Sequence, residues 1–167
     1  LIIALIAFPF AYWEAESIPS NNDLETWLPK ESEVRTTYDM FKEEFGAEEV
    51  ILVGLPHLNT DDPLVESVAE RLSQLPGIRH CWSPRRFREV MRDLSVSEDQ
   101  IEERITGLSL AKDKQMLGLI AMLSPAGLRD RSGTVKDVEA VLNYCQLRGD
   151  DVLLTGGPVV VAELDRL

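Results

Sequence analysis

The chain has 167 residues, of which 44% are hydrophobic and 28% are charged, so it is long enough and apolar enough to fold around a buried core. Its 29 acidic side chains outnumber the 17 basic ones and give a net charge of −12. This balance argues against nucleic-acid binding, because a face that binds phosphates must be basic. Residues 14–49 supply −8 of the charge, since eleven acids there accompany three basic residues.

The first thirteen residues, LIIALIAFPFAYW, are almost wholly apolar and end at Glu14. They are too few for a complete membrane span, which takes about 20 apolar helical residues. A signal peptide would have a basic region first and small residues at its cleavage site. Tyr12 and Trp13 suit the aromatic belt of a membrane surface, and the lack of Lys or Arg before Lys30 is typical of an outward-facing flank. We therefore expect a truncated transmembrane helix over residues 1–13, with a signal remnant and a core helix as alternatives.

A polar connector is expected over residues 14–31, where Pro19 and the following Ser-Asn-Asn break regular structure. A folded domain is expected over residues 32–157. Its first helix begins at Ser32 and ends at Gly46. Spacings of four, three and four residues predict an apolar stripe on that helix, made of Val34, Tyr38, Phe41 and Phe45.

Two short apolar runs, Val50 to Leu55 and Ile78 to Trp82, predict strands on either side of a helix. The first run lacks polar alternation, which suggests that both of its faces are covered. Asp62 is expected to cap the intervening helix, with Pro63 at its first position. That helix should bury Val65, Val68, Leu72 and Leu75 and end at Pro76-Gly77.

Two further helices are predicted next. Ser83 and Pro84 open the first, whose apolar residues are Phe87, Val90, Met91 and Leu94. Ser97 and Gln100 are expected to form a capping box for the second. Its apolar residues are Ile101, Ile105 and Leu108, and Gly107 is placed at its end.

The last third repeats the order strand, helix, strand. Met116 to Leu123 predicts a strand, and SPAGLRDRSG predicts a turn-rich loop after it. Thr134 is expected to cap a helix that ends at Gly149, with a fourth strand from Asp151 to Thr155. The residues expected to face inward from this helix are Val135, Val138, Val141, Leu142 and Cys145.

The stretch GGPVVV after the last predicted strand lacks the Lys-Ser/Thr ending of a phosphate-binding P-loop and the third glycine of a dinucleotide fingerprint. It predicts instead a new helix over residues 158–167, with Pro158 at the first position. The full order of elements is a helix, a strand-helix-strand unit, a helical insertion and a second such unit. Two such units with right-handed crossovers predict an α+β, ferredoxin-like split βαβ sandwich with helices on one sheet face.

Five arginines form the one basic cluster of this acidic chain, relieved only by Glu89: Arg79, Arg85, Arg86, Arg88 and Arg92. The cluster is a candidate contact for anionic lipid head groups or an acidic partner. The alternative, which the sequence favours, is a solvated helix face that pairs with nearby acids. Trp27, Trp82 and Phe87 could line a lipid groove, although aromatic residues at helix and strand positions usually belong to a core.

Other residue types indicate no reactive site. His57 and His80 have no Cys or His at ligand spacing, so no metal site is expected. Cys81 and Cys145 could pair outside the cytoplasm, but two unpaired buried thiols are the favoured interpretation, because sequence does not show that their Cα atoms approach. No Ser-His-Asp set, nucleophile elbow or carboxylate pair stands out, so we expect neither catalysis nor a cofactor.

The stretches NDLETWLPKESEVRTTYDMFKEEFGAEEVILVGL, PGIRHCWSP and LLTGGPVVVAELDRL, in this order and spacing, resemble the first extracytoplasmic loop of the resistance-nodulation-division (RND) transporter superfamily. The similarity is greatest to its MMPL and hopanoid-exporter-like branch, and it covers nearly the whole chain. It implies a porter domain on the periplasmic side of the bacterial inner membrane, between the first and second spans. Residues 158–167 would then lead into the next span.

This resemblance implies a pump that uses the proton gradient to move hydrophobic or amphiphilic molecules. Its implied partners are the lipid bilayer, the transported molecule, and the remaining transmembrane and porter domains of the transporter; homo-oligomer formation is left open. Residues 1–13 contain no Asp, Glu, His, Lys or Arg, so the proton-relay residues are expected in another part of the pump.

Two alternatives stay open beside the pump. One is a secreted or periplasmic binding module with the same sandwich and a signal-peptide remnant. The other is a small ferredoxin-like enzyme such as an acyl-phosphate hydrolase. Such an enzyme needs an arginine in an anion-cradling loop after the first strand, and GLPHLNTDD offers acids there instead.

Overall fold

The computed structural model of the chain describes residues 29, 31–37, 40 and 49–166. The chain divides into two units, Leu1–Ala47 and Glu48–Leu167. In the first unit, residues 33–37 and 40 are helical, within the helix predicted from Ser32. Val34 is 64% exposed there. The segment expected to be transmembrane, most of the connector, Trp27 and the remainder of the first predicted helix lie outside the described residues.

The second unit is built on a four-stranded antiparallel sheet, which confirms the α+β class. Its strand order is β2-β3-β1-β4. The strands are β1 (Val50–Leu55), β2 (Ile78–Trp82), β3 (Leu117–Leu123) and β4 (Leu153–Thr155). The bounds of β1 and β2 are those predicted. The fourth strand is shorter than predicted, because a 3-10 turn, η1 (Gly149–Asp151), occupies the residues before it.

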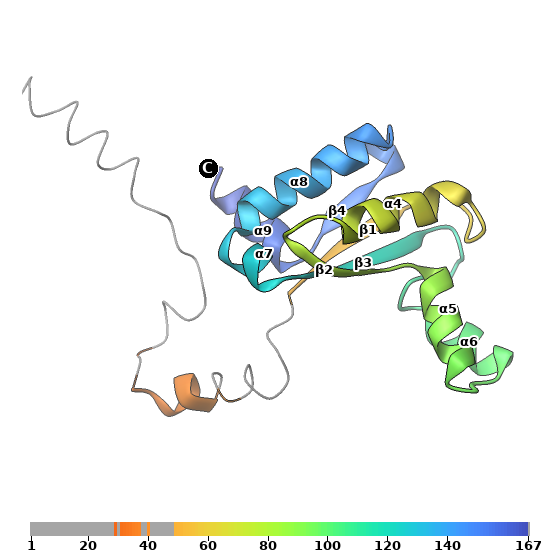
Figure 1. Cartoon of the computed structure of the whole chain (residues 1–167), viewed down its shortest axis with the longest axis horizontal. Coiled ribbons are helices and arrows are strands. Elements are labelled where there is room, and N and C mark those ends of the chain that lie inside the picture. The colour runs from red at the N-terminus through yellow and green to blue at the C-terminus, as the bar shows by residue number, and fades with distance from the viewer. Residues whose placement is uncertain (1–28, 30, 38–39, 41–48, 167) are drawn as a thin grey trace, which may run out of the picture. The chain divides into compact units, whose positions relative to one another are not determined.

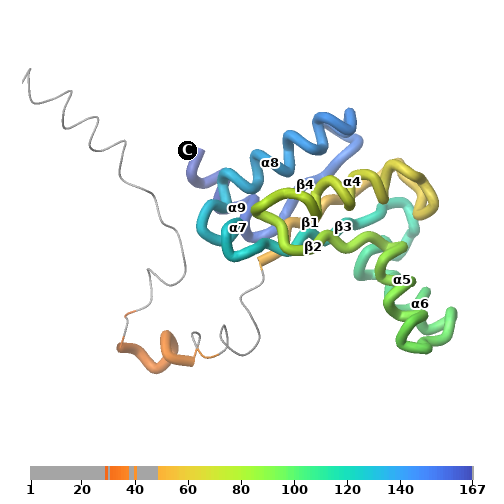
Figure 2. The backbone as a smooth tube through the Cα atoms, viewed as in Figure 1, coloured from red at the N-terminus to blue at the C-terminus, as the bar shows by residue number. Residues whose placement is uncertain are grey.

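The described helices of this unit are α4 (Pro63–Ser73), α5 (Pro84–Asp93), α6 (Glu98–Ile105), α7 (Pro125–Arg129), α8 (Arg131–Tyr144) and α9 (Gly157–Leu164). Helices α4 and α8 contact each other and lie over the same side of the sheet (Figures 1 and 2). Helices α5 and α6 pack side by side at one end of the sheet, in the segment expected to be a helical insertion. Helix α9 packs against α8 and β1.

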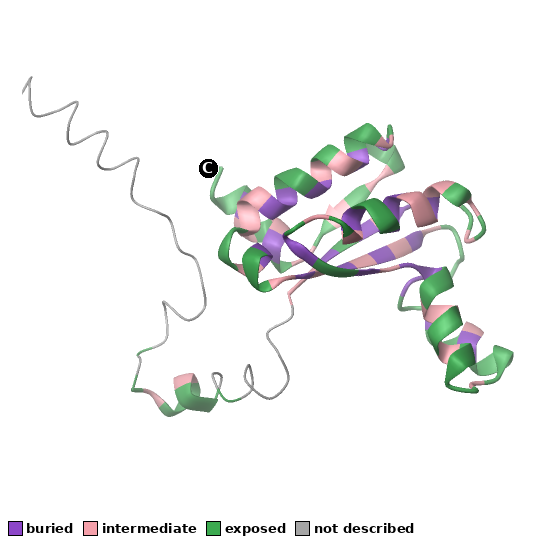
Figure 3. Cartoon of the chain, in the orientation of Figure 1, coloured by how far each residue is buried: buried purple, intermediate pink, exposed green. Residues whose placement is uncertain are grey.

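Strand β1 alternates between the two faces of the sheet, so the expectation that both of its faces are covered is wrong. Ile51, Val53 and Leu55 are fully buried, whereas Leu52 between them is 37% exposed. An antiparallel sheet with helices on one side alternates in this way. The run looks continuous in the sequence because the uncovered face of the strand is also apolar. Figure 3 shows the buried residues along the sheet and along the sides of α4 and α8 that face it.

Helix α4 forms as predicted, because its start carries a matched cap. The Asp62 carboxylate accepts a hydrogen bond from the Leu64 amide at 2.8 Å, and Pro63 occupies the first helical position. The fully buried stripe consists of Val65, Val68 and Leu72. Leu75 lies beyond the helix and packs against the core with partial exposure.

The predicted loop over residues 124–133 is wrong, because two caps start helices within it. The Ser124 hydroxyl accepts from the Gly127 amide at 3.1 Å and opens α7. The Asp130 carboxylate accepts from the Gly133 amide at 2.8 Å and opens α8. Thr134 is therefore inside α8 and not its cap, and its hydroxyl donates back to the Asp130 carbonyl at 2.8 Å.

Helix α8 ends at Tyr144 and not at Gly149. Gln146 adopts a left-handed conformation with φ of +61°, and the Leu147 amide donates to the Leu142 carbonyl at 3.0 Å. These are the features of a Schellman stop, which glycine usually provides. Helix α9 likewise begins one residue earlier than predicted, at Gly157, so Pro158 holds its second position.

The insertion is less buried than its sequence predicts. Val90 of α5 is 39% exposed and Leu94, just after that helix, is 72% exposed. Leu108 lies beyond α6 with 51% exposure. Ile101 and Ile105 are fully buried, as expected. The remaining apolar residues of α5, Phe87 and Met91, pack only partly against the core.

The predicted capping box at α6 does not form, because the Ser97 side chain makes no capping hydrogen bond. Ser83, at the start of α5, is fully buried, and its hydroxyl accepts from the Arg86 amide at 3.2 Å. The two serines stand at the starts of consecutive helices, but only Ser83 accepts the backbone hydrogen bond that makes a helix cap stabilising.

We expect Ser83→Ala to lower the free energy of unfolding by about 1 kcal/mol, because the Arg86 amide loses its acceptor. Ser97→Ala, the same chemical change at an exposed cap without that bond, should stay within about 0.5 kcal/mol of the original. Urea denaturation followed by circular dichroism measures both values. Equal losses at the two serines would contradict the assignment of the caps.

Candidate functional site: a cleft of paired charges

The five predicted arginines lie on two consecutive elements, the strand β2 and the helix α5 that follows it. Arg79 is on β2, and the other four are on α5. Arg85, Arg88 and Arg92 are spaced three and four residues apart, so they share one face of the helix. These three line a common cleft, whereas Arg79 and Arg86 are exposed and do not line it.

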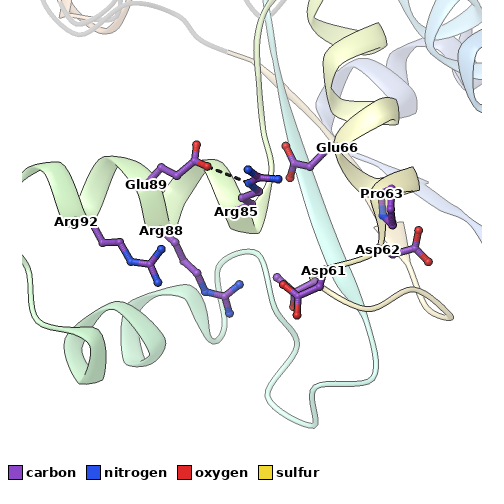
Figure 4. Close-up of a pocket in the computed structure, with 9 residues that line it drawn as sticks. Asp61, Asp62, Pro63, Glu66, Arg85, Arg88, Glu89 and Arg92 are labelled. Atoms are coloured by element: carbon purple, nitrogen blue, oxygen red, sulfur yellow. Dashed lines mark hydrogen bonds and ion pairs between the residues drawn. The ribbon is translucent and has the colours of Figure 1, made fainter.

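The cleft lies between α5 and the start of α4, with the loop before α4 on its other side (Figure 4). Its volume is about 660 Å³. The helix start brings acids to one wall and the arginines of α5 form the opposite wall. Its lining residues are Thr60, Asp61, Asp62, Pro63, Glu66, Arg85, Arg88, Glu89 and Arg92.

Each arginine of the cleft forms an ion pair with a glutamate. Arg85 pairs with Glu89 of the same helix, with Nε and Oε1 3.0 Å apart. Two bonds join Arg88 to a second glutamate, Glu102 of α6, at 2.8 and 3.1 Å. The third pair joins Arg92 to Glu98 at 2.6 Å. The basic cluster of the sequence is thus largely neutralised, as the interpretation of a charge-paired helix face requires.

The three pairs differ in what they do for the fold. In the pairs of Arg85 and Arg92 both side chains are more than half exposed, so each pair contributes little to the stability of the fold. The pairs of Arg88 and Arg92 both join α5 to α6, but the Arg88 side chain is only 19% exposed. The pair of Arg88 is therefore the one that is least screened by solvent.

Glu66 has a side-chain oxygen, Oε1, that is buried and has no hydrogen-bond partner among the described residues. In Figure 4 the Arg85 guanidinium lies between the carboxylates of Glu89 and Glu66. The hydrogen bond to Glu89 is the main cause that raises the pKa of Arg85, and the charge of Glu66 adds to it. The cleft thus presents cationic and anionic groups side by side, and Thr60 adds one hydroxyl.

The hydrogen bond from Arg92 lowers the pKa of Glu98 below its ordinary value of 4.5, and desolvation acts in the opposite direction. A lowered folded-state pKa stabilises the fold above pH 4.5, and that contribution is lost as the pH falls through the lowered value. We expect Arg92→Gln to raise the Glu98 pKa toward 4.5 in a carboxyl NMR titration. Arg85→Gln, which removes the partner of another glutamate, should leave it unchanged. An unaltered Glu98 pKa in Arg92→Gln would contradict the pairing.

The residues considered for metal or thiol chemistry are separated. His57 and His80 are both exposed, and within the described ranges no group of three His, Cys, Asp or Glu residues is arranged to hold a metal ion. Cys81 is buried on β2 and Cys145 half-buried after α8, and both are free thiols. Burial raises the pKa of the Cys81 thiol to about 12, which keeps it protonated at neutral pH.

The aromatic pair of Trp82 on β2 and Phe87 on α5 packs internally. The rings of Trp82 and Phe87 stack with centroids 5.0 Å apart, and the Trp82 indole donates to the Met122 sulfur at 3.2 Å. Neither residue lines the cleft of paired charges.

Sequence reasoning missed a second hollow, on the uncovered face of the sheet. It has a volume of about 340 Å³ and lies between the three adjacent strands β3, β1 and β4 and the loop that follows α6. We call it the sheet-face groove. Its lining contains no charged residue: Leu52, Val53, Gly54, Gly107, Leu108, Ser109, Leu110, Ala111, Met116, Leu117, Gly118, Leu119, Ile120, Leu153 and Thr155. An uncovered face of β1 would have indicated this groove. It was not predicted from the sequence, because both faces of that strand were expected to be covered.

Comparison with known proteins brings no match, either to a protein-family model or to a curated protein sequence. Within the part of the chain that the structure describes, no helix combines the length and apolar character needed to cross a bilayer.

Proposed function

We propose that the chain is the extracytoplasmic porter domain of a proton-driven exporter of lipids or other hydrophobic molecules, similar to the MMPL branch of the RND superfamily. In this role it handles the substrate and takes part in gating, without chemistry or a cofactor of its own. The proposal rests on the resemblance in the order and spacing of sequence stretches. The observation that carries it further is the strand order β2-β3-β1-β4.

That strand order supports the ferredoxin-like arrangement as the finer description of the fold. Strand β3 lies between β1 and β2, and β1 lies between β3 and β4, so each strand-helix-strand unit is split by a strand of the other. The connecting helices α4 and α8 contact each other over one face. A split βαβ sandwich has this order and leaves its second sheet face without helices.

The uncovered sheet face supports a hydrophobic cargo. Leu52 and Leu153 are 37% and 51% exposed there, and the groove between them has no charged lining. An apolar hollow on a rigid sheet suits the handling of a hydrophobic molecule, because its burial releases water from both surfaces. Gating in this proposal moves the sandwich as a unit, since a packed core is not continuously deformable.

In this proposal the five arginines remain the candidate contact for anionic lipid head groups or an acidic partner. Three of them already hold glutamates, so such a contact would have to exchange one anion for another. Arg86 is exposed and forms no ion pair with any described residue, which makes it the best placed of the α5 arginines for that contact.

Export by cells that produce the complete protein tests this function. Such cells should retain less of a neutral, fluorescently labelled single-chain alcohol than cells without the protein. A protonophore should abolish the difference, because the proton gradient drives the pump. Equal retention with and without the protein would contradict the exporter. Recovery of the protein in the periplasmic fluid would favour the alternative of a secreted binding module.

A further inference from the structure

The sheet-face groove follows a row of residues that lack side chains. Gly118 of β3 and Gly54 of β1 are register partners, and Leu153 of β4 is the partner of Gly54 on the other side. Directly opposite residues of an antiparallel sheet share a face. The next row on this face is Ile120, Leu52 and Thr155. Two adjacent glycines therefore leave a trough across the strands, beside a row of larger side chains.

The two ends of the trough are built differently. At one end, the loop after α6 continues the sheet beside β3, and the Gly118 amide donates to the Ser109 carbonyl at 2.8 Å. At the other end is Leu153, half-exposed on the edge strand β4. Met116 contributes the flexible wall, because its sulfur would lie 2.9 Å from a Cβ built on Gly54. Methionine adapts its shape to apolar ligands more readily than branched side chains do.

An unpaired polar group lies at the loop end of the trough. Ser109 is 1% exposed, it lines the groove, and its hydroxyl has no hydrogen-bond partner among the described residues. A buried hydroxyl without a partner costs free energy, so its presence beside an apolar hollow needs a reason. A ligand with one polar end would provide the missing partner.

From this geometry we propose that the sheet-face groove binds a single alkyl chain with a neutral polar end, and that Ser109 supplies the hydrogen bond to that end. One residue row along a strand pair is about 7 Å wide, which suits one hydrocarbon chain. An α-helix of a protein partner is about 10–12 Å across and does not fit such a row. A charged end group is disfavoured, because no lining residue carries an opposite charge to compensate its desolvation.

This inference rests on the proposed exporter function and names the surface that would contact its cargo. The groove volume of about 340 Å³ is at the lower end of the range of small-molecule sites, which favours one short chain over a complete lipid. The probe is therefore decanol, a neutral alcohol with one alkyl chain. Decanoate has the same chain with a carboxylate end and serves as the charged comparison.

The test titrates the whole 167-residue chain with decanol, followed through methyl NMR signals. We expect saturable shifts at Leu52, Leu108, Met116, Ile120 and Leu153, and decanoate at neutral pH should bind at least about tenfold more weakly. Shifts that are absent, or that are confined to residues outside the groove, would overturn the proposal. Equal affinity for decanol and decanoate would overturn the neutral end group.

Ser109→Ala separates a binding role from a structural one. The variant should bind decanol about 2- to 10-fold more weakly, because the ligand hydroxyl loses its partner. Its stability toward urea should be unchanged or higher, since it removes a buried hydroxyl that has no partner in the free protein. Unchanged affinity, or a loss of affinity that follows a loss of stability, would overturn the role of Ser109.

Leu153→Asp and Val160→Asp form a matched pair of new charges. Leu153 lines the groove with 51% exposure, and Val160 is 57% exposed on α9 and does not line it. We expect Leu153→Asp to lower decanol affinity about tenfold or more and Val160→Asp to leave it unchanged. If Leu153→Asp fails to fold, Ser109→Ala still decides the question. Equal effects of the two charges would overturn the site.

Binding and export are separable results. Decanol binding at the groove in a protein that exports nothing would refute the exporter and keep the groove. Proton-driven export by a protein whose groove binds no decanol would refute the groove and keep the exporter.

Discussion

Gly156→Ala is expected to lower the free energy of unfolding by about 2–5 kcal/mol, the largest effect of any glycine substitution considered. Gly156 has φ of +124° at the turn between β4 and α9, a conformation that residues with a Cβ rarely adopt. The added methyl group would also collide with the Val50 carbonyl oxygen and lie 3.4 Å from the Ile51 Cα. Backbone cannot move aside as a flexible side chain can, so strain and collision add.

The neighbouring glycine provides the matched control. Gly157 begins α9 with a negative φ, and a Cβ built on it meets no atom within 4 Å. Gly157→Ala should leave the free energy of unfolding unchanged or raise it by up to about 1 kcal/mol. Urea denaturation curves of both variants give the two values. Similar stability of the two variants would show that the turn is not held in the described conformation.

Leu119→Ala is expected to lower the free energy of unfolding by about 3 kcal/mol, which is the second of the two largest expected effects. Leu119 lies on β3 and is fully buried, with 0% exposure. It faces the helix-covered side of the sheet. Its truncation removes buried methyl groups and leaves a cavity in a close-packed core. The measurement is the shift of the urea midpoint at an unchanged denaturant slope.

Leu153→Ala removes the same atoms from the other face of the sheet. Because Leu153 is 51% exposed on an edge strand, its truncation should cost about 1 kcal/mol or less. The difference between the two leucines measures how far one face is core and the other is open. Comparable losses at both positions would mean that the uncovered face is buried in the folded protein.

The sheet and the core helices could be predicted from the sequence because their signals are local. Short apolar runs between breakers identify β1 and β2 to the residue, and Asp62 followed by proline marks the start of α4. The covered face of β1 could not be chosen from the sequence, because both of its faces carry apolar residues. The choice depends on which side α4 and α8 occupy, which is a tertiary property.

Two helix ends have no signal in the sequence, because the residues that form them are not the usual ones. Gln146 and Ser95 take left-handed conformations with φ of +61° and +59° just after α8 and α5. Glycine is the expected residue at such positions, so neither stop has a sequence signal. Ser124 and Asp130 are ordinary caps, but they lie in a segment rich in glycine and charge that resembles a loop.

The arginine cluster was visible in the sequence, but its ion-pair partners were not. Arg88 finds Glu102 fourteen residues away on another helix. A longer-range example is Arg131 at the start of α8, which holds both carboxylate oxygens of Glu49, just before β1, at 2.7 and 2.8 Å. Prediction of the sheet-face groove would need still more information. Its two glycines become neighbours only through the register in which β1 pairs with β3. Pairing across such distances is set by the fold and not by local spacing.

An alkaline carbonate wash of membranes from cells that produce the complete protein tests the central claim most directly. A domain tethered to a bilayer by hydrophobic spans should stay in the membrane pellet and require detergent for release, because the wash removes only proteins held by surface contacts. Release of the intact protein into the wash would contradict membrane attachment, and with it the exporter.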